Sequence, residues 1–492
     1  MTINRNFSSD IRALLSDPDL FREAALIDGA WITRNDMAVN NPASGSVLGH
    51  MPDCSAAETE VAIAAAEQAM KAWRKRTHAE RADLLFAWYQ LILDHTDDLA
   101  LILTAEQGKP LAEAKGEIIY GASFVRWFAE EARRINGDII PSPVPGKKIF
   151  AMKEPVGVCA IITPWNFPNA MITRKVAPGL AAGCTMVIKP SDFTPYSALA
   201  LGVLAERAGI PKGVLNILTG HPEGIGATLT GSPVVRKLSF TGSTRVGALL
   251  AEQCAPTLKK LSLELGGNAP LIVFNDADLD AAVEGAMISK YRNGGQTCVC
   301  ANRILVQSDI HDAFVTALAA KVDALKVGVG TEENVNIGPM INADAIFKIN
   351  AHVEDALSKG ASRATSKRDL SDQFADPMVL TGATTEMRLA SEETFGPVSP
   401  IFKFETEEEA LEIANGTPFG LAAYFFTTDM TRAFRVAEAL EVGLVGLNTG
   451  AVSHAEAPFG GVKSSGLGRE GAQEGIEEYL ETKAFHFGGL SV

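Results

Sequence analysis

Between residues 156 and 265, the sequence alternates short apolar runs with stretches of helical periodicity. These runs and stretches follow one another at residues 156–163, 185–189, 198–208, 214–219, 224–229, 237–240 and 245–255. Strands that alternate with helices predict a parallel sheet that is covered by helices on both faces. A second alternating block starts near residue 269 and continues beyond Pro400. We therefore expect an α/β architecture.

The segments outside these blocks show other patterns. Up to residue 137 the chain is mostly helical in pattern, with apolar residues at three- and four-residue spacing over residues 56–73 and 80–105. A proline-rich stretch then precedes an extended run at residues 148–153. Residues 358–376 are polar and aperiodic, which predicts a surface loop, and residues 475–487 predict a short helix followed by a strand.

The composition limits the class of protein. The chain has 492 residues, of which 47% are hydrophobic and 21% are charged, enough apolar surface to fill a large core. A prior of roughly 150 residues per domain predicts about three domains. The formal net charge of −15 and the absence of any block of Lys and Arg in the sequence argue against a nucleic-acid binder. We therefore expect a small molecule as the ligand.

The sequence also bears on compartment and metal content. No apolar run approaches the roughly 18 residues that a membrane span needs, and the first ten residues lack the apolar core of a signal peptide. The six cysteines are widely scattered, unlike a disulfide framework or a pair of zinc-binding Cys-x-x-Cys hooks. We therefore expect a cytoplasmic protein with neither a membrane anchor nor a metal site.

Two glycine patterns resemble dinucleotide-binding turns. Residues 466–471 match Gly-x-Gly-x-x-Gly, but no apolar strand precedes them and no acidic residue follows at the spacing of a βαβ unit, so we reject this match. Residues 242–247 follow an apolar strand and open a helix, so their backbone N–H groups could meet a phosphate. A plain strand-to-helix turn explains the second pattern equally well.

Three further segments carry side chains suited to catalysis. Cys298 follows a glycine-rich turn, where free backbone N–H groups lower a thiol pKa or hold an oxyanion; a small buried cysteine is the alternative. Glu264 lies among apolar residues, which raise a carboxyl pKa and suit it to general-base work, although a buried salt-bridge partner is equally consistent. Asn166 sits between two prolines, which form either a rigid mount for an amide aimed at an oxyanion or a plain turn.

Taken together, seven motifs occur in an order that resembles the NAD(P)-dependent aldehyde dehydrogenases along nearly the entire chain. They are Pro-Trp-Asn-Phe-Pro at 164–168, Lys-Pro-Ser at 189–191, Phe-Thr-Gly-Ser-Thr at 240–244, Leu-Glu-Leu-Gly-Gly-Asn at 263–268, Gly-Gln-Thr-Cys at 295–298, Glu-Thr-Phe-Gly-Pro at 393–397 and Pro-Phe-Gly-Gly at 458–461. Chance recurrence of seven ordered motifs is negligible.

The resemblance implies a Rossmann-like cofactor domain, an α/β catalytic domain and a small β oligomerisation arm. The expected limits are residues 1–137 and 158–264 for the NAD(P)-binding domain, residues 265–474 for the catalytic domain, and residues 138–157 and 475–492 for the arm. In the family this arm pairs edge strands between subunits, which covers exposed edges. A homodimer or homotetramer is therefore expected.

The resemblance also implies catalytic roles for three residues. In the family, the thiolate that matches Cys298 attacks the aldehyde carbon and forms a thiohemiacetal, whose oxygen is held by the side chain that matches Asn166. Hydride then passes to the nicotinamide, and the carboxylate that matches Glu264 activates the water that hydrolyses the thioester. The implied cofactor is NADP or NAD.

Eight residues match cofactor contacts of the family: Trp165, Lys189, Ser191, Asp192, Gly242, Ser243, Glu393 and Phe395. The resemblance places Lys189 at the adenosine ribose, Gly242 and Ser243 near the pyrophosphate, and Glu393 at the nicotinamide ribose with Phe395 beside it. An acid at Asp192 would hydrogen-bond a free ribose 2′-hydroxyl and repel a 2′-phosphate. Bacterial relatives of this type often favour NADP, with a small residue at that position, so the preference stays open.

Within the family, the strongest resemblance is to succinate-semialdehyde dehydrogenases. Arg174 and Arg292 match the arginine pair that these enzymes use on the distal carboxylate, and Ser453 matches the hydroxyl that completes the site. Phe167 and Phe459 would line the aldehyde tunnel. The resemblance implies oxidation of succinate semialdehyde to succinate. Glutarate semialdehyde or another aldehyde is the alternative substrate, because sequence does not measure the tunnel.

Further alternatives stay open. Cys300 lies two residues from Cys298, as in relatives in which a reversible disulfide shuts the enzyme off. A cysteine acyl-transferase or thioester hydrolase would use Cys298 and Glu264 without redox chemistry. A non-catalytic binding protein on the same scaffold would not require Cys298, Glu264 and Asn166 together.

Overall fold

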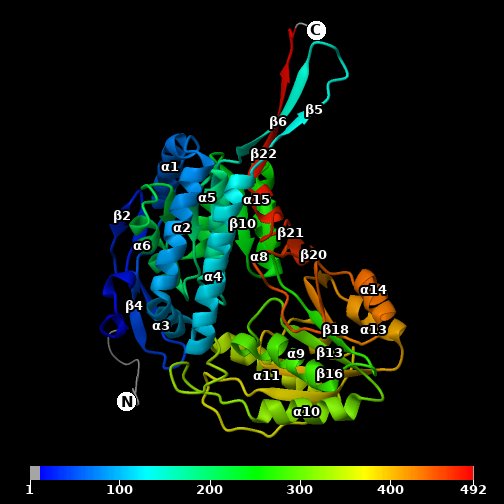
Figure 1. Ribbon diagram of the computed structural model, residues 1–492. Helices are drawn as coiled ribbons and strands as arrows, with labels where there is room; N and C mark the ends of the chain where they lie inside the picture. Colours follow the sequence, from blue (N-terminus) through cyan, green and yellow to red (C-terminus); the bar gives the residue numbers. More distant parts are fainter. Residues whose placement is uncertain (1–10, 491–492) are drawn as a thin grey trace.

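The computed structural model describes residues 11–490 and has two α/β lobes and a projecting arm (Figure 1). The first lobe is built around an eight-stranded sheet in the order β2-β1-β9-β8-β7-β10-β11-β21. Its strands are β1 (Ala25–Ile27), β2 (Ala30–Ile32), β7 (Val158–Ile162), β8 (Thr185–Lys189), β9 (Leu215–Ile217), β10 (Val235–Thr241), β11 (Lys260–Glu264) and β21 (Gly466–Leu467). The five strands from β9 to β11 run parallel, whereas β1 and β21 join the sheet antiparallel.

Successive side chains of β7 point to opposite faces of this sheet and pack against helices on each face. Cys159 and Ile161 pack mainly with α2 to α6, whereas Val158 and Ala160 pack with α1, α7 and α8. The helices are α1 (Ala56–Trp73), α2 (His78–Asp94), α3 (Thr96–Gln107), α4 (Leu111–Glu131), α5 (Ala170–Ala182), α6 (Pro195–Arg207), α7 (Pro222–Gly231) and α8 (Thr244–Cys254). The strand order reverses between β7 and β10, a position where α/β sheets bind ligands.

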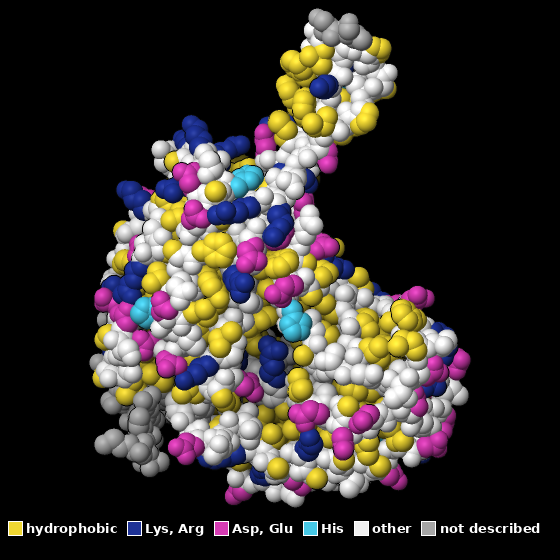
Figure 2. Space-filling view, viewed as in Figure 1, with side chains coloured by type: hydrophobic (Ala, Val, Ile, Leu, Met, Phe, Trp, Pro, Cys, Tyr) yellow, Lys and Arg dark blue, Asp and Glu magenta, His cyan; other side chains and the backbone are white. Residues whose placement is uncertain are grey.

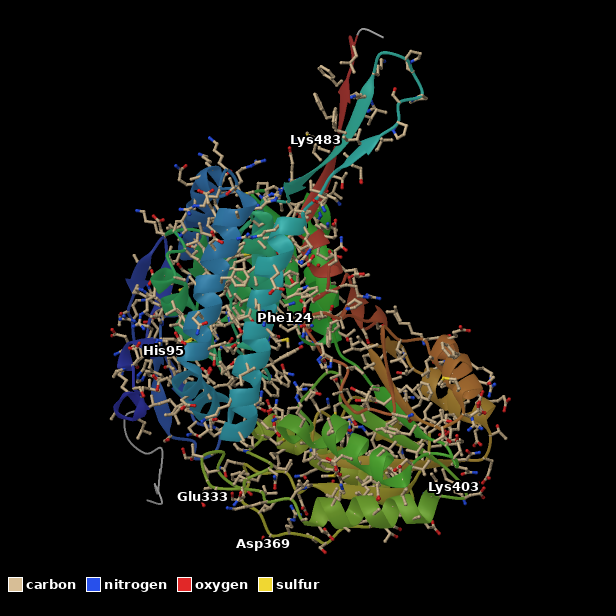
Figure 3. The ribbon with its side chains drawn as sticks, viewed as in Figure 1. His95, Phe124, Glu333, Asp369, Lys403 and Lys483 are labelled. Atoms are coloured by element: carbon tan, nitrogen blue, oxygen red, sulfur yellow. The ribbon has the colours of Figure 1, made fainter. Side chains whose placement is uncertain are left out.

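The second lobe contains a seven-stranded sheet in the order β14-β15-β16-β13-β12-β18-β19, parallel except for β14. Its strands are β12 (Ala269–Val273), β13 (Ala301–Gln307), β14 (Ser362–Arg363), β15 (Met378–Ala383), β16 (Val398–Phe404), β18 (Ala422–Phe426) and β19 (Leu444–Leu447). One face carries α9 (Leu279–Tyr291) and α10 (His311–Asp323). The other carries α11 (Ala343–Ser358), α12 (Arg388–Ser391), α13 (Glu407–Asn415) and α14 (Met430–Ala439). Lys403 on β16 marks this lobe in Figure 3.

The arm is a three-stranded antiparallel sheet of β5 (Asp138–Ile140), β6 (Lys148–Pro155) and β22 (Leu480–Phe487). It extends away from both lobes, and hydrophobic side chains gather on its surface (Figures 1 and 2). Ile139 is 71% exposed, and Phe485 and Phe487 are each 45% exposed. Lys483 marks β22 in Figure 3. The arm thus presents apolar surface that a partner could bury.

The remaining elements are short. Two further pairs of strands are β3 (Met37–Asn40) with β4 (Val47–Met51) and β17 (Phe419–Gly420) with β20 (Val462–Lys463). A short helix α15 (Glu474–Glu477) precedes β22. Single 3₁₀ turns cover η1 (Ile11–Leu14), η2 (Pro18–Leu20), η3 (Ala132–Arg134), η4 (Ala255–Thr257) and η5 (Arg292–Gly295).

The structure confirms the two predicted α/β blocks and the predicted helix and strand of the C-terminal tail. The helical pattern over residues 80–105 is confirmed and corresponds to two helices, because α2 ends at Asp94 and a new helix starts at Thr96. Apolar periodicity continues across this break and conceals it. The limits of the three domains remain a prediction, and β21, which they assign to the catalytic domain, pairs with β11 of the first sheet.

The mostly helical pattern expected up to residue 137 missed strands β1 to β4. Strand β1 has three residues, and it pairs with β2 and with the distant β9. A strand this short is defined by its partners in the sheet, so it leaves no periodic signal of its own.

Two classes of feature are absent from the described part of the chain. Over residues 11–490, none of the helices has the length and apolar character that crossing a bilayer requires. Over the same residues, no group of three or more His, Cys, Asp and Glu side chains is arranged to hold a metal ion.

Candidate active site

The candidate residues of the first lobe lie at the carboxyl ends of its parallel strands. Asn166 follows β7, Lys189 ends β8, Gly242 follows β10 and Glu264 ends β11. Parallel strands bring their carboxyl ends to one edge of the sheet, so these residues gather there although they are up to 98 positions apart in the chain. The surface is hollowed between the two lobes on the face shown in Figure 2.

The second lobe contributes Cys298 on the turn between α9 and β13. Asn293, Gly294 and Gly295 have positive φ angles of 53°, 61° and 76°, which glycine adopts without cost and asparagine tolerates better than most residues. This turn directs Cys298 into a cavity of about 350 Å³, hereafter the Cys298 cavity. The cavity is lined among others by Trp165, Asn166, Thr241, Gly242, Ser243, Cys298, Glu393 and Phe395.

The Cys298 thiol is protonated in this environment. Burial raises the pKa of Cys298 to about 12, although the positive charge of Arg174 acts in the opposite direction. The glycine-rich turn suggested a lowered pKa from nearby backbone N–H groups, and here burial outweighs that effect. The thiol must therefore lose its proton before it acts as a nucleophile.

Asn166 connects the first lobe to this turn. Its Nδ2 donates a hydrogen bond to the carbonyl oxygen of Gln296 at 3.0 Å, and Asn293 Nδ2 donates to the carbonyl oxygen of Asn166 at 2.9 Å. One amide hydrogen of Asn166 remains available for another acceptor, since an NH₂ group carries two. The amide is thus fixed on Gln296, two positions before Cys298 in the chain, and Asn166 and Cys298 line the same cavity, as an oxyanion-binding role requires.

A buried ion pair that the sequence interpretation missed supports Asn166. Lys109 Nζ donates to the carbonyl oxygen of Asn166 at 2.9 Å and also to Glu117 Oε2, and both side chains are 1% exposed. Glu117 Oε1 in turn accepts the backbone N–H groups of Asn169 and Ala170 at the start of α5. Lys109 and Glu117 lie eight residues apart across the break before α4, a spacing with no sequence signature.

Glu264 is a buried carboxyl group without a compensating partner. Among the residues that the structure describes, neither of its side-chain oxygens has a hydrogen-bond partner. Burial, reinforced by the charge of Glu470, raises the pKa of Glu264 well above its usual range. A Cβ atom at Gly460 would lie 2.9 Å from Glu264 Oε1, so the glycine leaves space beside the carboxyl group. These are properties of a general base that awaits a water molecule.

The far wall of the Cys298 cavity comes from the second lobe. Glu393 Oε1 accepts the backbone N–H of Gly267 at 3.1 Å, and burial raises the pKa of Glu393 to about 7. Phe395 has a φ of 56°, which strains a non-glycine residue, and its ring meets that of Trp165 edge-on at 5.6 Å. Both aromatic rings therefore line the same cavity as Cys298.

The start of α8 forms another wall of this cavity. Ser243 is the N-cap of α8, and its hydroxyl accepts the backbone N–H of Val246. Gly242 donates its N–H to the carbonyl oxygen of Glu264 at 3.0 Å. A helix N-terminus that opens onto a cavity favours a phosphate there.

Three predicted cofactor contacts lie outside the lining of the Cys298 cavity, at the end of β8. Lys189 Nζ donates to Asp192 Oδ1 and to the carbonyl oxygen of Pro190, both at 2.8 Å. The Ser191 hydroxyl accepts the backbone N–H of Phe193. Asp192 thus pairs with Lys189, so its negative charge is partly neutralised.

A second cavity, of about 580 Å³, lies on the other side of the loop that carries Asn166, and we call it the Arg292 cavity. It is lined among others by Lys109, Glu113, Tyr120, Phe167, Tyr291 and Arg292. The guanidinium of Arg292 lies 4.9 Å from the centre of the Phe167 ring. Asn166 lines one cavity and the next residue, Phe167, lines the other, so the two spaces lie close together.

Arg174 is buried beside these cavities and lines neither of them. Its Nε donates a hydrogen bond to Glu470 Oε2. The other oxygen of this carboxylate, Oε1, accepts a hydrogen bond from Lys175 Nζ. Its guanidinium lies 4.0 Å from the centre of the Phe459 ring. Within residues 11–490, Arg174 Nη2 has no hydrogen-bond partner. This nitrogen is therefore a buried donor without an acceptor among the described residues.

Glu470 lies within the glycine pattern at residues 466–471, whose role as a dinucleotide fingerprint we rejected. The structure confirms the rejection, because Gly466 and Leu467 form β21 against β11. The acidic residue of the pattern, Glu470, instead forms an ion pair with Arg174. Only a search for the partner of Arg174 could have found it.

Ser453 and Cys300 complete the predicted set. Ser453 is half-buried, and its side chain lies near enough to the Tyr120 hydroxyl to lower the pKa of that group. Cys300 is buried, and its thiol donates to the carbonyl oxygen of Lys290 at 3.6 Å. Both Cys298 and Cys300 are free thiols in this structure. The disulfide between them remains a prediction.

Comparison with known proteins gives a consistent result. The sequence pattern of the Aldehyde dehydrogenase family matches residues 31–485. A glutarate-semialdehyde dehydrogenase of Pseudomonas aeruginosa is 56% identical over 97% of this chain and 100% of its own length. A succinate-semialdehyde dehydrogenase [NADP(+)] of Escherichia coli is 54% identical over 95% of this chain and 98% of its own length.

A solved structure agrees with these sequence matches. The succinate-semialdehyde dehydrogenase of Burkholderia pseudomallei superposes with a TM-score of 0.95 at 57% identity, and the match covers 96% of this chain and 100% of that one. The fold, the order of the motifs and the extent of these matches lead to one conclusion. The chain belongs to the aldehyde dehydrogenase family.

Proposed function

We propose that this protein oxidises succinate semialdehyde to succinate with NADP or NAD. The observation that carries this proposal is the pair of arginines beside the nucleophile. Among the described residues, Arg174 Nη2 has no hydrogen-bond partner; the charge of Arg174 acts on Cys298, and Arg292 lines the adjacent cavity. Two guanidinium groups suit a carboxylate at the far end of a short aldehyde, because each can form parallel charge-assisted hydrogen bonds.

The Cys298 cavity fits the nicotinamide half of a dinucleotide. Its lining contains the buried hydroxyl of Thr241, which has no hydrogen-bond partner among the described residues. Gly242 and Ser243 at the start of α8 would hold the pyrophosphate, and Glu393 the nicotinamide ribose, with Trp165 and Phe395 beside the ring. Lys189, Ser191 and Asp192 would meet the adenosine ribose. Because Lys189 pairs with Asp192, both a 2′-hydroxyl and a 2′-phosphate remain compatible with this end.

Cys298 and Asn166 would carry out the first step. The Cys298 thiol gives its proton to a water molecule, and the thiolate attacks the aldehyde carbon to form a thiohemiacetal. The free amide hydrogen of Asn166 then binds the developing oxyanion, while its other hydrogen keeps the side chain fixed on Gln296. When bound, the dinucleotide supplies the oxidising chemistry, since it accepts the hydride that leaves the thiohemiacetal carbon.

Glu264 would carry out the second step. A water molecule in the space beside Gly460 would lie against the Glu264 carboxylate. The carboxylate takes a proton from this water as the water attacks the thioester, and it passes that proton to the departing Cys298 sulfur as succinate is released. The raised pKa of Glu264 means that the group must first lose its proton, and that its carboxylate is then a stronger base than that of an exposed glutamate.

Glutarate semialdehyde is a second candidate substrate. The relative from Pseudomonas aeruginosa that bears this name is as similar to this chain as the succinate-semialdehyde dehydrogenases are. The same two arginines would bind its carboxylate, and the Arg292 cavity of about 580 Å³ has room for one more methylene.

Steady-state kinetics test the proposal. The absorbance of reduced nicotinamide is followed with succinate semialdehyde, glutarate semialdehyde and butanal, each with NAD and with NADP. We expect kcat/KM for succinate semialdehyde to exceed that for butanal by about a hundredfold or more, because butanal lacks the carboxylate. Equal values for the two aldehydes would exclude the substrate assignment. Ester hydrolysis without any cofactor reduction would instead favour a cysteine acyl-transferase, and no reaction at all would favour a binding protein.

We further propose that the chain forms a homodimer or homotetramer through the arm of β5, β6 and β22. Ile139, Phe485 and Phe487 are exposed on this arm, and an isolated three-stranded sheet with exposed apolar residues and free edges is poorly suited to water. Native mass spectrometry should give two or four chains per particle. Ile139→Asp together with Phe485→Asp should shift the particle to one chain, and an unchanged mass would exclude the arm as the interface.

A further inference from the structure

Three aromatic rings support the two arginines of the candidate site. Arg292 lies over Phe167, and Arg174 lies over Phe459 and, at 5.7 Å from the ring centre, over Phe124. A guanidinium held over a ring keeps its hydrogen-bonding edge free for a ligand. Phe124 lies on α4 in the first lobe, and it is labelled in Figure 3.

Tyr120 lies between the rings that carry the two arginines. It is one helical turn before Phe124 on α4, and the two rings meet edge-on with their centres 5.0 Å apart. On its other side, Tyr120 packs against the cluster formed by Phe167, Ala170 and Met171. Tyr120 also lines the Arg292 cavity. Its position is therefore fixed from both sides.

The hydroxyl of Tyr120 faces the groups that are expected to bind the substrate carboxylate. Ser453, Arg174 and Arg292 each lower the pKa of this hydroxyl, so the three side chains lie near it. Burial raises the pKa of Tyr120 despite the two arginines, so the hydroxyl keeps its proton at neutral pH. A protonated phenol can accept a hydrogen bond from Ser453 and still donate its own proton to an acceptor.

We propose that Tyr120 is a specificity-determining residue that donates its hydroxyl proton to the distal carboxylate of the substrate, between Arg174 and Arg292. This inference rests on the proposed function and extends it by one residue. A carboxylate accepts hydrogen bonds only, so a neutral donor between two guanidinium groups adds a bond without adding charge. The aromatic neighbours fix the direction of that bond, so an aldehyde without a carboxylate gains nothing from it.

Tyr120→Phe is the direct test, because it removes the hydroxyl and keeps the ring that packs on Phe124 and Phe167. We expect KM for succinate semialdehyde to rise about tenfold or more, as the loss of a hydrogen bond to a charged group implies. We expect kcat for succinate semialdehyde, and both constants for butanal, to change by less than about twofold. The split arises because the hydroxyl would touch the carboxylate and not the reacting carbon.

Tyr196→Phe is the matched control. It removes another buried tyrosine hydroxyl, which donates to the carbonyl oxygen of His50 and lies outside both cavities. We expect this variant to keep the wild-type KM for both aldehydes. An unchanged KM for succinate semialdehyde in Tyr120→Phe, or an equal rise for both aldehydes, would overturn the inference.

The wild-type enzyme separates this inference from the proposed function. If the wild type does not prefer succinate semialdehyde to butanal, the proposed function fails whatever the variant does. If the wild type shows the preference and Tyr120→Phe retains it in full, only the role of Tyr120 fails.

Discussion

The Cys298 cavity and the Arg292 cavity are built in different ways. The groups of the first cavity come from strand ends and turns: Asn166 after β7, Gly242 after β10 and Cys298 on the turn after α9. The groups of the second come largely from helices, with Tyr120 on α4 and Arg292 at the end of α9. In the proposed mechanism the first cavity carries out the reaction and the second selects the substrate. The backbone at strand ends can fix the reacting groups in place, whereas side chains on the surrounding helices can differ and so change which substrate is bound.

The strongest way to separate the two cavities is Cys298→Ala. The account predicts that turnover falls by about four orders of magnitude or more with every aldehyde, because no other group in the site can form the covalent intermediate. Binding of the dinucleotide, measured by calorimetry, should persist because its contacts are elsewhere in the cavity. If the residual activity of Cys298→Ala differed between aldehydes, the assignment of the reaction to one cavity and of substrate selection to the other would be contradicted.

Arg292→Ala tests the other side of the comparison. This change should lower kcat/KM for succinate semialdehyde by about a hundredfold, because it removes one of two charged partners of the carboxylate. For butanal the expected change is below about threefold. Arg133→Ala removes an exposed arginine that pairs with Asp83 on the surface and serves as the control. Equal losses of kcat/KM for the two aldehydes would show that Arg292 contributes to the reaction itself and not to the selection of the substrate.

The pH dependence of Cys298 reactivity sharpens the description of the first cavity. Burial raises the pKa of the Cys298 thiol to about 12, so only a small fraction is thiolate at neutral pH. Below that pKa, the thiolate fraction grows about tenfold for each pH unit. Alkylation by iodoacetamide, followed by mass spectrometry of the Cys298 peptide between pH 7 and 9, should accelerate accordingly. A rate that levels off near pH 7 would show that the thiol is already ionised.

Lys109→Met tests whether a residue of the Arg292 cavity also affects the reaction in the Cys298 cavity. Lys109 lines the Arg292 cavity, yet it donates to the backbone of Asn166. The change should lower kcat by about fivefold to tenfold for succinate semialdehyde and butanal alike, because Asn166 loses one support. It should also lower the free energy of unfolding by about 3 kcal/mol, since Glu117 becomes a buried unpaired charge.

A second substitution separates these two effects of Lys109. Adding Glu117→Gln to Lys109→Met removes the unpaired charge, so most of the lost stability should return while kcat stays low. The midpoint of urea unfolding and the two kcat values give the comparison. A variant with normal kcat for both aldehydes would confine Lys109 to a structural role.

The sequence allowed more of the first cavity to be predicted than of the second. Motifs such as Gly-Gln-Thr-Cys and Pro-Trp-Asn-Phe-Pro are continuous, so Cys298 and Asn166 could be identified without a structure. The buried state of the Cys298 thiol could not, because it depends on the charges and side chains that surround it in space. The β1 strand was missed for the same reason, as its pairing with β9 is not local.

The second cavity and the buried Arg174 near it depend on residues that only the fold brings together. Arg174 and Arg292 were predicted from the resemblance, but Tyr120 and Glu470 were not. Tyr120 is one of many aromatic residues on apolar helix faces, where core packing is the ordinary interpretation. Glu470 is 296 positions from Arg174, and the glycine pattern around it drew attention to the wrong property. Contacts between distant helices and loops leave no short motif.

A crystal structure of Cys298→Ala with NADP and succinate semialdehyde is the most direct test of the division into a reaction cavity and a selection cavity. The account predicts the nicotinamide ring in the cavity lined by Trp165, Glu393 and Phe395. It predicts the carboxylate of the substrate within hydrogen-bond distance of both Arg174 and Arg292, and its aldehyde carbon beside residue 298. A carboxylate bound away from both arginines, or a dinucleotide outside that cavity, would contradict it.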